Sequence, residues 1–281
     1  MNPALDLSLR LTAIALLLRP MGPWYVRPVV LAAGALALTF PRVLRSSALW
    51  WVVAIAVFIR IAEDWPLADN HIYLLGYWCL ANAIALRDSE PPAALGQMSR
   101  WLLGLAFTFA VMWKAVLAPD YLDGRFFRVT FLSDPRLIEP AMLLGGLTAD
   151  DLEQSRLALE ALPEGAELLA PRRVVETGRL RTLSAISTWG VLAHEAAIAT
   201  AMLLPSAPIV VAARHALLLS FCAVTYAFAP VAGFGWLLLV IGLAQVPRDA
   251  YWLRVAYVGA YLLVIFYAEV PWPELIMRLW S

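Results

Sequence analysis

The sequence predicts an all-α fold, a polytopic integral-membrane helical bundle of eight or nine transmembrane helices. Hydrophobic residues make up 62% of the 281 residues and charged residues only 15%, with a mean hydropathy of +0.74. That balance is typical of a membrane protein rather than a soluble domain. Apolar runs close to the length of a membrane span recur along the chain, and prolines, tryptophans and tyrosines gather at their ends. Proline ends helices, and aromatic side chains favour the membrane interface.

The expected spans divide the chain into three parts. We expect N-terminal transmembrane helices over 1–117, a connection over 118–181 and C-terminal transmembrane helices over 182–281. The first 20 residues form a weaker ninth run because Asp6 and Arg10 interrupt it, and they fit a helix lying on the membrane surface equally well. The other spans are placed near 26–41, 48–62, 70–86, 97–117, 182–204, 208–230, 233–246 and 251–270.

Arginine placement predicts the orientation in an inner (plasma) membrane. Short connections rich in arginine alternate with one that carries Glu63, Asp64 and Asp69. By the positive-inside rule the arginine side is cytoplasmic, so the connection 118–181 is expected outside. Within it, 148–162 reads as an amphipathic helix with Thr148 as its N-cap, which fits either a lid or spacer helix or a docking surface. Its apolar positions are Leu152, Leu157, Leu159 and Leu162.

Composition narrows the function classes. The net charge is zero, so nothing indicates a nucleic-acid partner. Cys79 and Cys222 lie inside apolar runs, and the chain has only three histidines. A disulfide framework or a bound metal is therefore not expected. The expected partners are the lipid bilayer, a membrane quinone and either a protein substrate or a partner subunit.

The chain contains a single lysine, Lys114, near the end of the predicted span 97–117. An ammonium can become neutral on burial, whereas a guanidinium cannot. A lysine at membrane depth is therefore a candidate base, although snorkelling of the ammonium to the interface explains its position equally well.

Polar residues within the predicted spans form two layers. The outer layer holds Asp69, Asn70, His71, Lys114 and Asp120, and antiparallel neighbouring spans are expected to bring His71 and Lys114 to similar depth. This layer predicts a proton-transfer site. The competing interpretation has Asn70 as an N-cap and Lys114 paired with Asp120.

The deeper layer is predicted to be a structural polar cluster of His194, Glu195, Arg214 and His215. These residues lie on two spans joined by a short turn, so Glu195 is expected to pair with Arg214 or His215. Tyr226 lies farther outward on the second of these spans.

Two segments resemble a known family. The segment 69–76, DNHIYLLG, resembles the Asn-His-x-Tyr-Leu-x-Gly segment of vitamin K-dependent gamma-glutamyl carboxylases, which belong to the wider HTTM (horizontally transferred transmembrane) domain family. The segment 107–124 resembles that family's apolar span ending in lysine, followed by an acid and a glycine. A weaker match is an acid in one span followed by Arg and His in the next, here Glu195, Arg214 and His215.

The resemblance implies a chemistry for the outer layer. It implies that Lys114 is the base that deprotonates a reduced vitamin K or related quinol, with His71 and Asn70 in the same catalytic site. The implied activity is oxygen-dependent epoxidation or glutamate carboxylation, of oxidoreductase or carbon-carbon lyase type. Tyr73, Trp113, Tyr226 and Asp120 are expected to contact the quinone or substrate.

Departures from the family shift the expected activity. The carboxylases carry two adjacent lysines where this chain has Trp113 and Lys114, and a large lumenal domain that follows their spans has no counterpart in these residues. The resemblance therefore supports deprotonation of a hydroquinone by this chain better than it supports carboxylation of glutamate. The alternative is a non-catalytic membrane subunit that binds a quinone or lipid and supports a partner protein. A small transporter ranks third, because no inverted repeat is visible.

Overall fold

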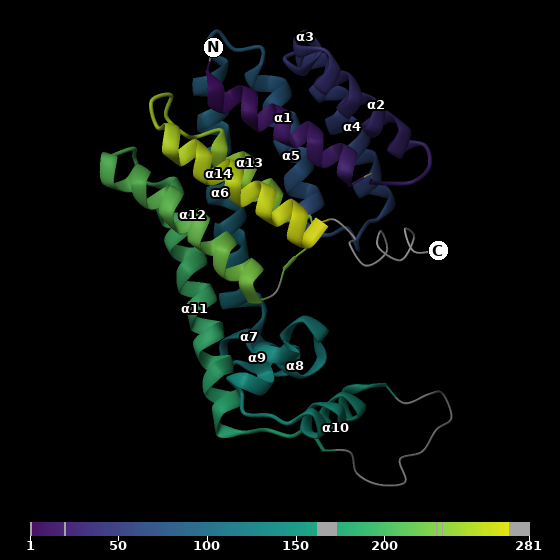
Figure 1. Ribbon diagram of the computed structural model, residues 1–281, viewed down its shortest axis with the longest axis vertical. Helices are drawn as coiled ribbons and strands as arrows, with labels where there is room; N and C mark the ends of the chain where they lie inside the picture. The colour runs from purple at the N-terminus through teal and green to yellow at the C-terminus, as the bar shows by residue number, and fades with distance from the viewer. Residues whose placement is uncertain (1, 20, 162–172, 229, 232, 270–281) are drawn as a thin grey trace. The chain divides into compact units, whose positions relative to one another are not determined.

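The computed structural model describes residues 2–19, 21–161, 173–228, 230–231 and 233–269, and every regular element in these ranges is a helix (Figure 1). The predicted all-α class is therefore confirmed. The α-helices are α1 Pro3–Leu18, α2 Val26–Thr39, α3 Pro41–Leu44, α4 Ser47–Glu63, α5 Asn70–Ala85, α6 Pro91–Met112, α7 Pro119–Leu122, α8 Arg125–Ser133, α9 Ile138–Leu143, α10 Ala149–Leu159, α11 Gly178–Leu203, α12 Pro208–Phe228, α13 Gly235–Leu243 and α14 Tyr251–Val264. Three short segments wind differently: π-helices η1 Trp113–Leu117 and η3 Ile265–Glu269, and a 3-10 helix η2 Pro135–Leu137.

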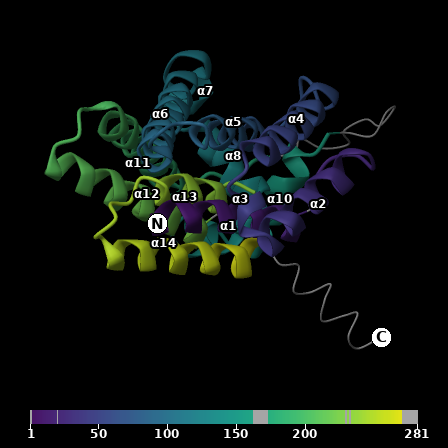
Figure 2. The ribbon, with the colours of Figure 1, turned by 90° about the horizontal axis from the view of Figure 1, so that it is seen from above.

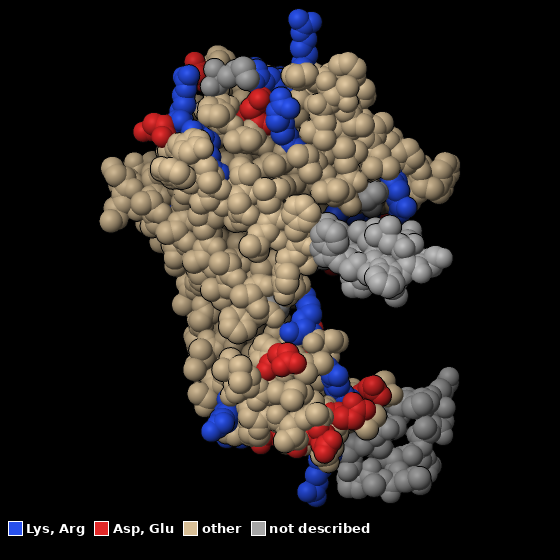
Figure 3. All heavy atoms as spheres, viewed as in Figure 1, with Lys and Arg blue, Asp and Glu red and all other residues tan. Residues whose placement is uncertain are grey.

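Two helical segments of the described chain are long and apolar enough to cross a membrane, judged by length and composition. They are Pro91–Leu117, which joins α6 to η1, and Pro208–Phe228, which is α12. Val26–Thr39 and Tyr251–Tyr267 are apolar but shorter. On the face drawn in Figure 3, the surface over α12 and most of α14 shows few charged side chains. Large apolar side chains are exposed on both helices, including Ile209, Val224 and Leu263.

The chain divides into two compact units, and each is described by itself. Unit 1 comprises 1–106, 198–226 and 231–281, and unit 2 comprises 107–197 and 227–230. Unit 2 covers a longer residue range than the expected connection 118–181, because the end of α6 and most of α11 belong to it. Helices α6 and α11 therefore contribute residues to both units.

Unit 1 is built around α13, whose residues are all buried. A helix that is apolar on every side is stable only when neighbours surround it. Helices α1, α5 and α14 contact α13, while α2 packs on α1 and α4 on α2 and α5 (Figure 2).

Helix α1 belongs to the core of unit 1, and whether the first 20 residues span the membrane stays open. Its Leu9 and Leu16 are buried. Thr12 accepts a hydrogen bond from Trp78 Nε1 at 3.0 Å, and Tyr261 donates from its hydroxyl to the Leu11 carbonyl at 2.7 Å. Asp6 forms ion pairs with Arg10 and Arg45, so the charges that weakened this run as a span stabilise its start.

Unit 2 has a hydrophobic core of its own. It is formed by Phe131, Leu132, Leu137, Ala141, Leu147, Leu152 and Leu180, with Phe127, Ile138, Val175 and Leu183 packed against it. These residues come from α8, η2, α9, α10 and the start of α11. The described parts of the predicted connection thus fold into helices with a shared core.

Helix α10 confirms the cap of the predicted amphipathic helix and places one of its leucines in the core of unit 2. Thr148 is its N-cap and forms a capping box with Asp151, as the sequence predicted for the cap. Leu152 enters the core, whereas Leu157 and Leu159 are 44% and 39% exposed, and their contact with another apolar surface stays a prediction. Leu162 lies outside the described residues.

Thr148→Ala is expected to lower the free energy of unfolding by about 1 kcal/mol, because it leaves the first amide groups of α10 without their side-chain acceptor. Hydrogen exchange of the α10 amides measures this effect. Thr182→Ala is the control, since the exposed Thr182 hydroxyl bonds only to the Gly178 carbonyl of its own helix. Equal exchange in the two variants would contradict the capping role.

Candidate functional site

The single lysine is bonded to a buried carboxylate within unit 2. Lys114 Nζ donates to both carboxylate oxygens of Glu195, with Oε2 at 2.5 Å. The Glu195 side chain is 7% exposed and the Lys114 side chain 21%. The pair is therefore almost closed to solvent on the Glu195 side, while the amine keeps access from outside.

Local backbone geometry positions the lysine. Lys114 lies in η1, where the helix widens to π geometry directly after α6. Single π turns are rare within helices and occur frequently at functional sites. Trp113 and Val116, in the same turn, are 62% and 73% exposed, so an apolar surface adjoins the amine.

Tyr121 forms one wall of this site. Lys114 Nζ lies 5.5 Å from the centroid of its ring, in cation–π range. Tyr121 is 4% exposed, and its hydroxyl has no hydrogen-bond partner among the described residues. Burial raises the pKa of Tyr121, and the negative charge of Glu195 raises it further. The phenol therefore stays neutral and can both donate and accept a hydrogen bond.

The expected pairing of Glu195 with Arg214 or His215 is wrong. Glu195 bonds to Lys114, and Arg214 instead donates to the carbonyls of Ala201 and Leu204, at 2.7 and 2.6 Å, and to the Ser206 hydroxyl at 3.1 Å. The last carbonyls of a helix lack partners within it, so the end of α11 attracts this guanidinium. The Lys114–Asp120 alternative is also wrong, because Asp120 is exposed and the lysine is bonded to Glu195.

The other members of the predicted deeper cluster have separate roles. His215 Nδ1 lies 2.9 Å from the Tyr257 hydroxyl within unit 1. His194 is half-buried and precedes Glu195 on α11, and adjacent residues on a helix face different directions. Because His194 and Glu195 belong to unit 2 and Arg214 and His215 to unit 1, the expected cluster of all four residues stays a prediction.

Tyr226 stabilises a turn in unit 1. Its hydroxyl donates to the Val231 carbonyl and accepts from the Gly235 amide at 2.6 Å. A Cβ at Gly235 would lie 2.3 Å from the Tyr226 ring, so only glycine fits there. The expected quinone contact of Tyr226 stays a prediction.

The Asn-His motif lies at the start of α5 in unit 1. Asp69 is the N-cap of this helix, so the interpretation of Asn70 as N-cap is wrong by one residue. Asn70 is exposed and Tyr73 half-buried. Because His71 belongs to unit 1 and Lys114 to unit 2, their expected meeting at one depth stays a prediction.

His71 lines a cavity of about 870 Å³ within unit 1, a size typical of small-molecule sites. Arg19, Arg60, Asp69, Gly233 and Trp236 also line it. Trp236 is 2% exposed, and its indole N–H has no partner among the described residues. A Cβ at Gly233, where φ is +84°, would lie 2.7 Å from His71 Nε2, so glycine permits the approach of the imidazole. The lining of the cavity is thus rich in charged side chains, and the Trp236 N–H is enclosed rather than open to the cavity.

Sequence reasoning missed several of these residues. Tyr121 and Trp236 look like interface aromatics in the sequence, and nothing local marks their polar atoms as buried. The partner of Lys114 is 81 residues away in the sequence. One signal was available: Ser184, Thr188 and Glu195 are spaced to lie on one helix face.

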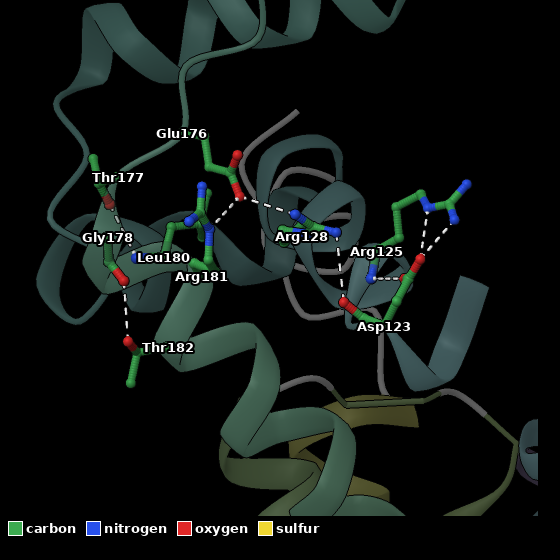
Figure 4. A network of polar contacts seen from close by, with 9 residues as sticks. All are labelled: Asp123, Arg125, Arg128, Glu176, Thr177, Gly178, Leu180, Arg181 and Thr182. Carbon is green, nitrogen blue, oxygen red and sulfur yellow. Dashed lines mark hydrogen bonds and ion pairs between the residues drawn. The ribbon is translucent and has the colours of Figure 1, made fainter. Parts of the chain in front are cut away.

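A polar network joins α8 to the start of α11 (Figure 4). Glu176 Oε1 accepts from Arg128 Nη1 at 3.0 Å and from Arg181 Nε at 3.2 Å. Arg128 also donates to the Asp123 carbonyl, and Asp123 pairs with Arg125. The network holds the α7–α8 turn, which contains Tyr121's neighbours, near the N-terminal end of α11.

Acid is expected to weaken this junction. The hydrogen bonds from Arg181 and Arg128 hold the pKa of Glu176 below its ordinary value of 4.5. A depressed carboxyl pKa contributes stability that is fully present above 4.5 and is lost as the pH falls through the folded-state value. The effect is small, under about 1 kcal/mol, because the groups are partly exposed. Hydrogen exchange of α8 and α11 amides against pH measures it, and Glu176→Gln should remove this part of the pH dependence.

The chain matches no family model, no curated protein and no solved structure.

Proposed function

We propose that the chain is a multi-pass inner-membrane protein that binds a reduced quinol of vitamin K type and removes its phenolic proton with Lys114. The observation that carries the proposal is the bond between the only lysine and a buried glutamate beside an exposed apolar surface. A buried ionisable pair in an apolar helix is a functional-site hypothesis by default. The resemblance of segments 69–76 and 107–124 to the HTTM carboxylases supports the choice of ligand.

The membrane part of the proposal is a bundle of eight or nine spans with its site open to the extracytoplasmic side. The two helices with span length and the broad apolar surface of α12 and α14 support it. A lipid-soluble quinol would reach the site laterally, along the exposed faces of Trp113 and Val116. Its ring could lie against these side chains while a ring hydroxyl points to the amine.

The Lys114–Glu195 pair supplies the base as a unit. In a low-dielectric site the proton can move from the ammonium to the carboxylate, which leaves an amine beside a carboxylic acid with no change in net charge. The amine then takes the phenolic proton and becomes an ammonium, and the quinolate keeps the electron pair of the broken O–H bond. The ammonium stabilises the quinolate by its charge. The following oxygen-dependent epoxidation or glutamate carboxylation is what the resemblance implies.

Asn70 and His71 are proposed to orient the ring oxygen, as the resemblance implies. The cavity beside His71 has the volume for a quinone head group. A double-mutant cycle of His71→Ala and Lys114→Ala tests this proposal. Strongly non-additive losses would mean that both residues act on one ring, and additive losses would assign the cavity a different ligand.

The proposal is tested by oxygen-dependent turnover of a reduced naphthoquinone by the purified protein. Wild type should form epoxide or quinone, and Lys114→Ala should lose at least about 10²-fold in turnover, the usual contribution of a general base. Lys114→Arg should fail as well, because a guanidinium cannot give up its proton. Glu195→Gln should also lose turnover, while Glu153→Gln, an exposed glutamate of α10, is the matched control. Wild-type turnover that survives Lys114→Ala would sink the proposal.

One observation favours a second candidate, a non-catalytic membrane subunit that binds a quinone or lipid and supports a partner protein. Lys114 already has an ionic partner, so a fixed charge alone could explain why it is there. This candidate predicts binding of the reduced naphthoquinone without turnover, and binding that Lys114→Arg leaves unchanged.

A further inference from the structure

One face of α11 in unit 2 carries a buried polar stripe. Ser184, Thr188 and Glu195 are four and seven residues apart, a spacing that places them on the same side of a helix. Ser184 is 1% exposed, Thr188 0% and Glu195 5%. Buried polar side chains in such a row need partners, because an unmade hydrogen bond in the interior is costly.

The hydroxyls of this stripe lack protein partners. Ser184 Oγ and Thr188 Oγ1 are buried and bonded to no described residue, and the same holds for the Tyr121 hydroxyl. Most buried side-chain polar atoms in proteins are bonded to protein or to ordered water. Three such hydroxyls in one unit therefore have hydrogen-bonding capacity that enclosed water, which usually makes about three hydrogen bonds, would satisfy.

The turn that carries Tyr121 faces this stripe. Gly124 follows Tyr121 by one turn, with its amide bonded to the Tyr121 carbonyl at 3.1 Å. A Cβ at Gly124 would lie 3.7 Å from Thr188 Oγ1 and 3.8 Å from the Ser184 carbonyl carbon. At its other end the turn reaches the ion pair, since the Tyr121 ring lies over Lys114 Nζ. The three hydroxyls and the ion pair thus belong to one continuous packing region of unit 2.

We propose that ordered waters join Glu195 to the hydroxyls of Tyr121, Thr188 and Ser184, and that this chain carries protons between the Lys114–Glu195 pair and the water at the start of α11. Ser184 and Glu195 are separated by about 16 Å at 1.5 Å per residue. Hydrogen bonds of about 2.8 Å let a few waters and the intervening hydroxyls span that distance. The proposal rests on the proposed function for its direction, because only a base that takes up a proton needs to release one.

The proton balance closes in two steps. After the quinol loses its proton, the pair holds an ammonium and a carboxylic acid, one proton more than at rest. The acid O–H bond of Glu195 breaks toward the neighbouring water, each hydroxyl or water in the chain passes on one proton and receives one, and a proton leaves to bulk water. The pair returns to ammonium and carboxylate, and no electrons are transferred in these steps.

Thr188→Val tests the proposal, because it removes the hydroxyl and keeps the side-chain shape. Turnover of reduced naphthoquinone should fall by on the order of tenfold, less than the loss of the base itself, and the solvent deuterium isotope effect should rise as proton release becomes limiting. Thr188→Ser should restore both. Thr182→Val is the matched control on the same helix, since the Thr182 hydroxyl is exposed and bonded to the Gly178 carbonyl.

A second readout does not depend on activity. A structure of the wild-type protein determined finely enough to show waters should place them within hydrogen-bond distance of Thr188 Oγ1 and the Tyr121 hydroxyl, and the Thr188→Val structure should lose them. The thermal midpoint should fall in Thr188→Val if its hydroxyl holds water, and rise if that hydroxyl is unsatisfied. A dry stripe with a higher midpoint would overturn the proton path even if turnover is present. Water in place with no wild-type turnover would overturn the proposed function and, with it, the direction of transfer.

Discussion

Lys114→Ala is expected to lower the free energy of unfolding by about 3–5 kcal/mol, besides abolishing turnover. The substitution leaves the Glu195 carboxylate buried without its partner, and breaking a buried pair from one side costs about that much. Glu195→Ala should show a similar loss, because Lys114 is itself mostly buried. Denaturation of the protein in detergent micelles, followed by hydrogen exchange in unit 2, measures both losses.

The double variant separates pairing from packing. Lys114→Met with Glu195→Leu removes both charges and keeps most of the volume, so it should be close to wild type in stability while turnover stays absent. A double variant that loses as much stability as the two single variants together would show that the pair contributes little as a pair. Such a result would move the interpretation of Lys114 back to an ammonium that reaches toward the interface.

Arg214→Ala is expected to be the most damaging substitution in unit 1, with a loss of about 3 kcal/mol or more. Hydrogen bonds to a charged group contribute about 1.5–3 kcal/mol each, and Arg214 makes three. Their acceptors include the last carbonyls of α11, which have no partner within the helix. The amides before Leu204 should therefore exchange faster in this variant.

Arg254→Ala is the matched control for this prediction. Arg254 also donates to two backbone carbonyls, those of Pro247 and Arg248, but in an exposed position. It should lose well under half as much stability. Arg214→Lys should not rescue, because a single ammonium cannot reach acceptors spread over three residues. Equal losses in the free energy of unfolding at positions 214 and 254 would contradict the argument that burial makes the hydrogen bonds of Arg214 stronger.

Much of the fold follows from local sequence. Apolar runs predicted each major helix, with most ends within a few residues and α6 beginning six residues before its expected start, because helix formation depends on neighbours three and four positions apart. Thr148 and Asp151 also indicate the start of α10, because a capping box joins residues three positions apart. The helix over 149–159 was placed well. The burial of each of its leucines was not predictable in the same way, because tertiary packing decides which side of a helix is covered.

The candidate site followed from the sequence only in part. Lys114 stands out because it is the only lysine, but its partner could not be found by folding 182–230 as a simple hairpin. That assumption put Arg214 opposite Glu195, whereas the guanidinium bends back to the carbonyls at the end of its neighbouring helix. A long side chain with several donors can bond to any acceptor within its length. Which acceptors lie within that length depends on backbone positions that the sequence does not give.

The separation of Lys114 and Glu195 along the chain has a consequence for biogenesis. Glu195 is made 81 residues after its partner. Under the proposed function, the apolar segment 91–117 would therefore enter the bilayer carrying a lysine that has no counter-ion yet. A lone lysine at mid-bilayer costs about 2.5–3.5 kcal/mol during insertion, less near the membrane surface. The segment that follows would therefore fold before the Lys114–Glu195 pair has formed. The pair could stabilise the inserted chain only after α11 has been made. Ribosome-bound chains truncated before residue 195 should slip from the membrane more readily than chains that extend past it.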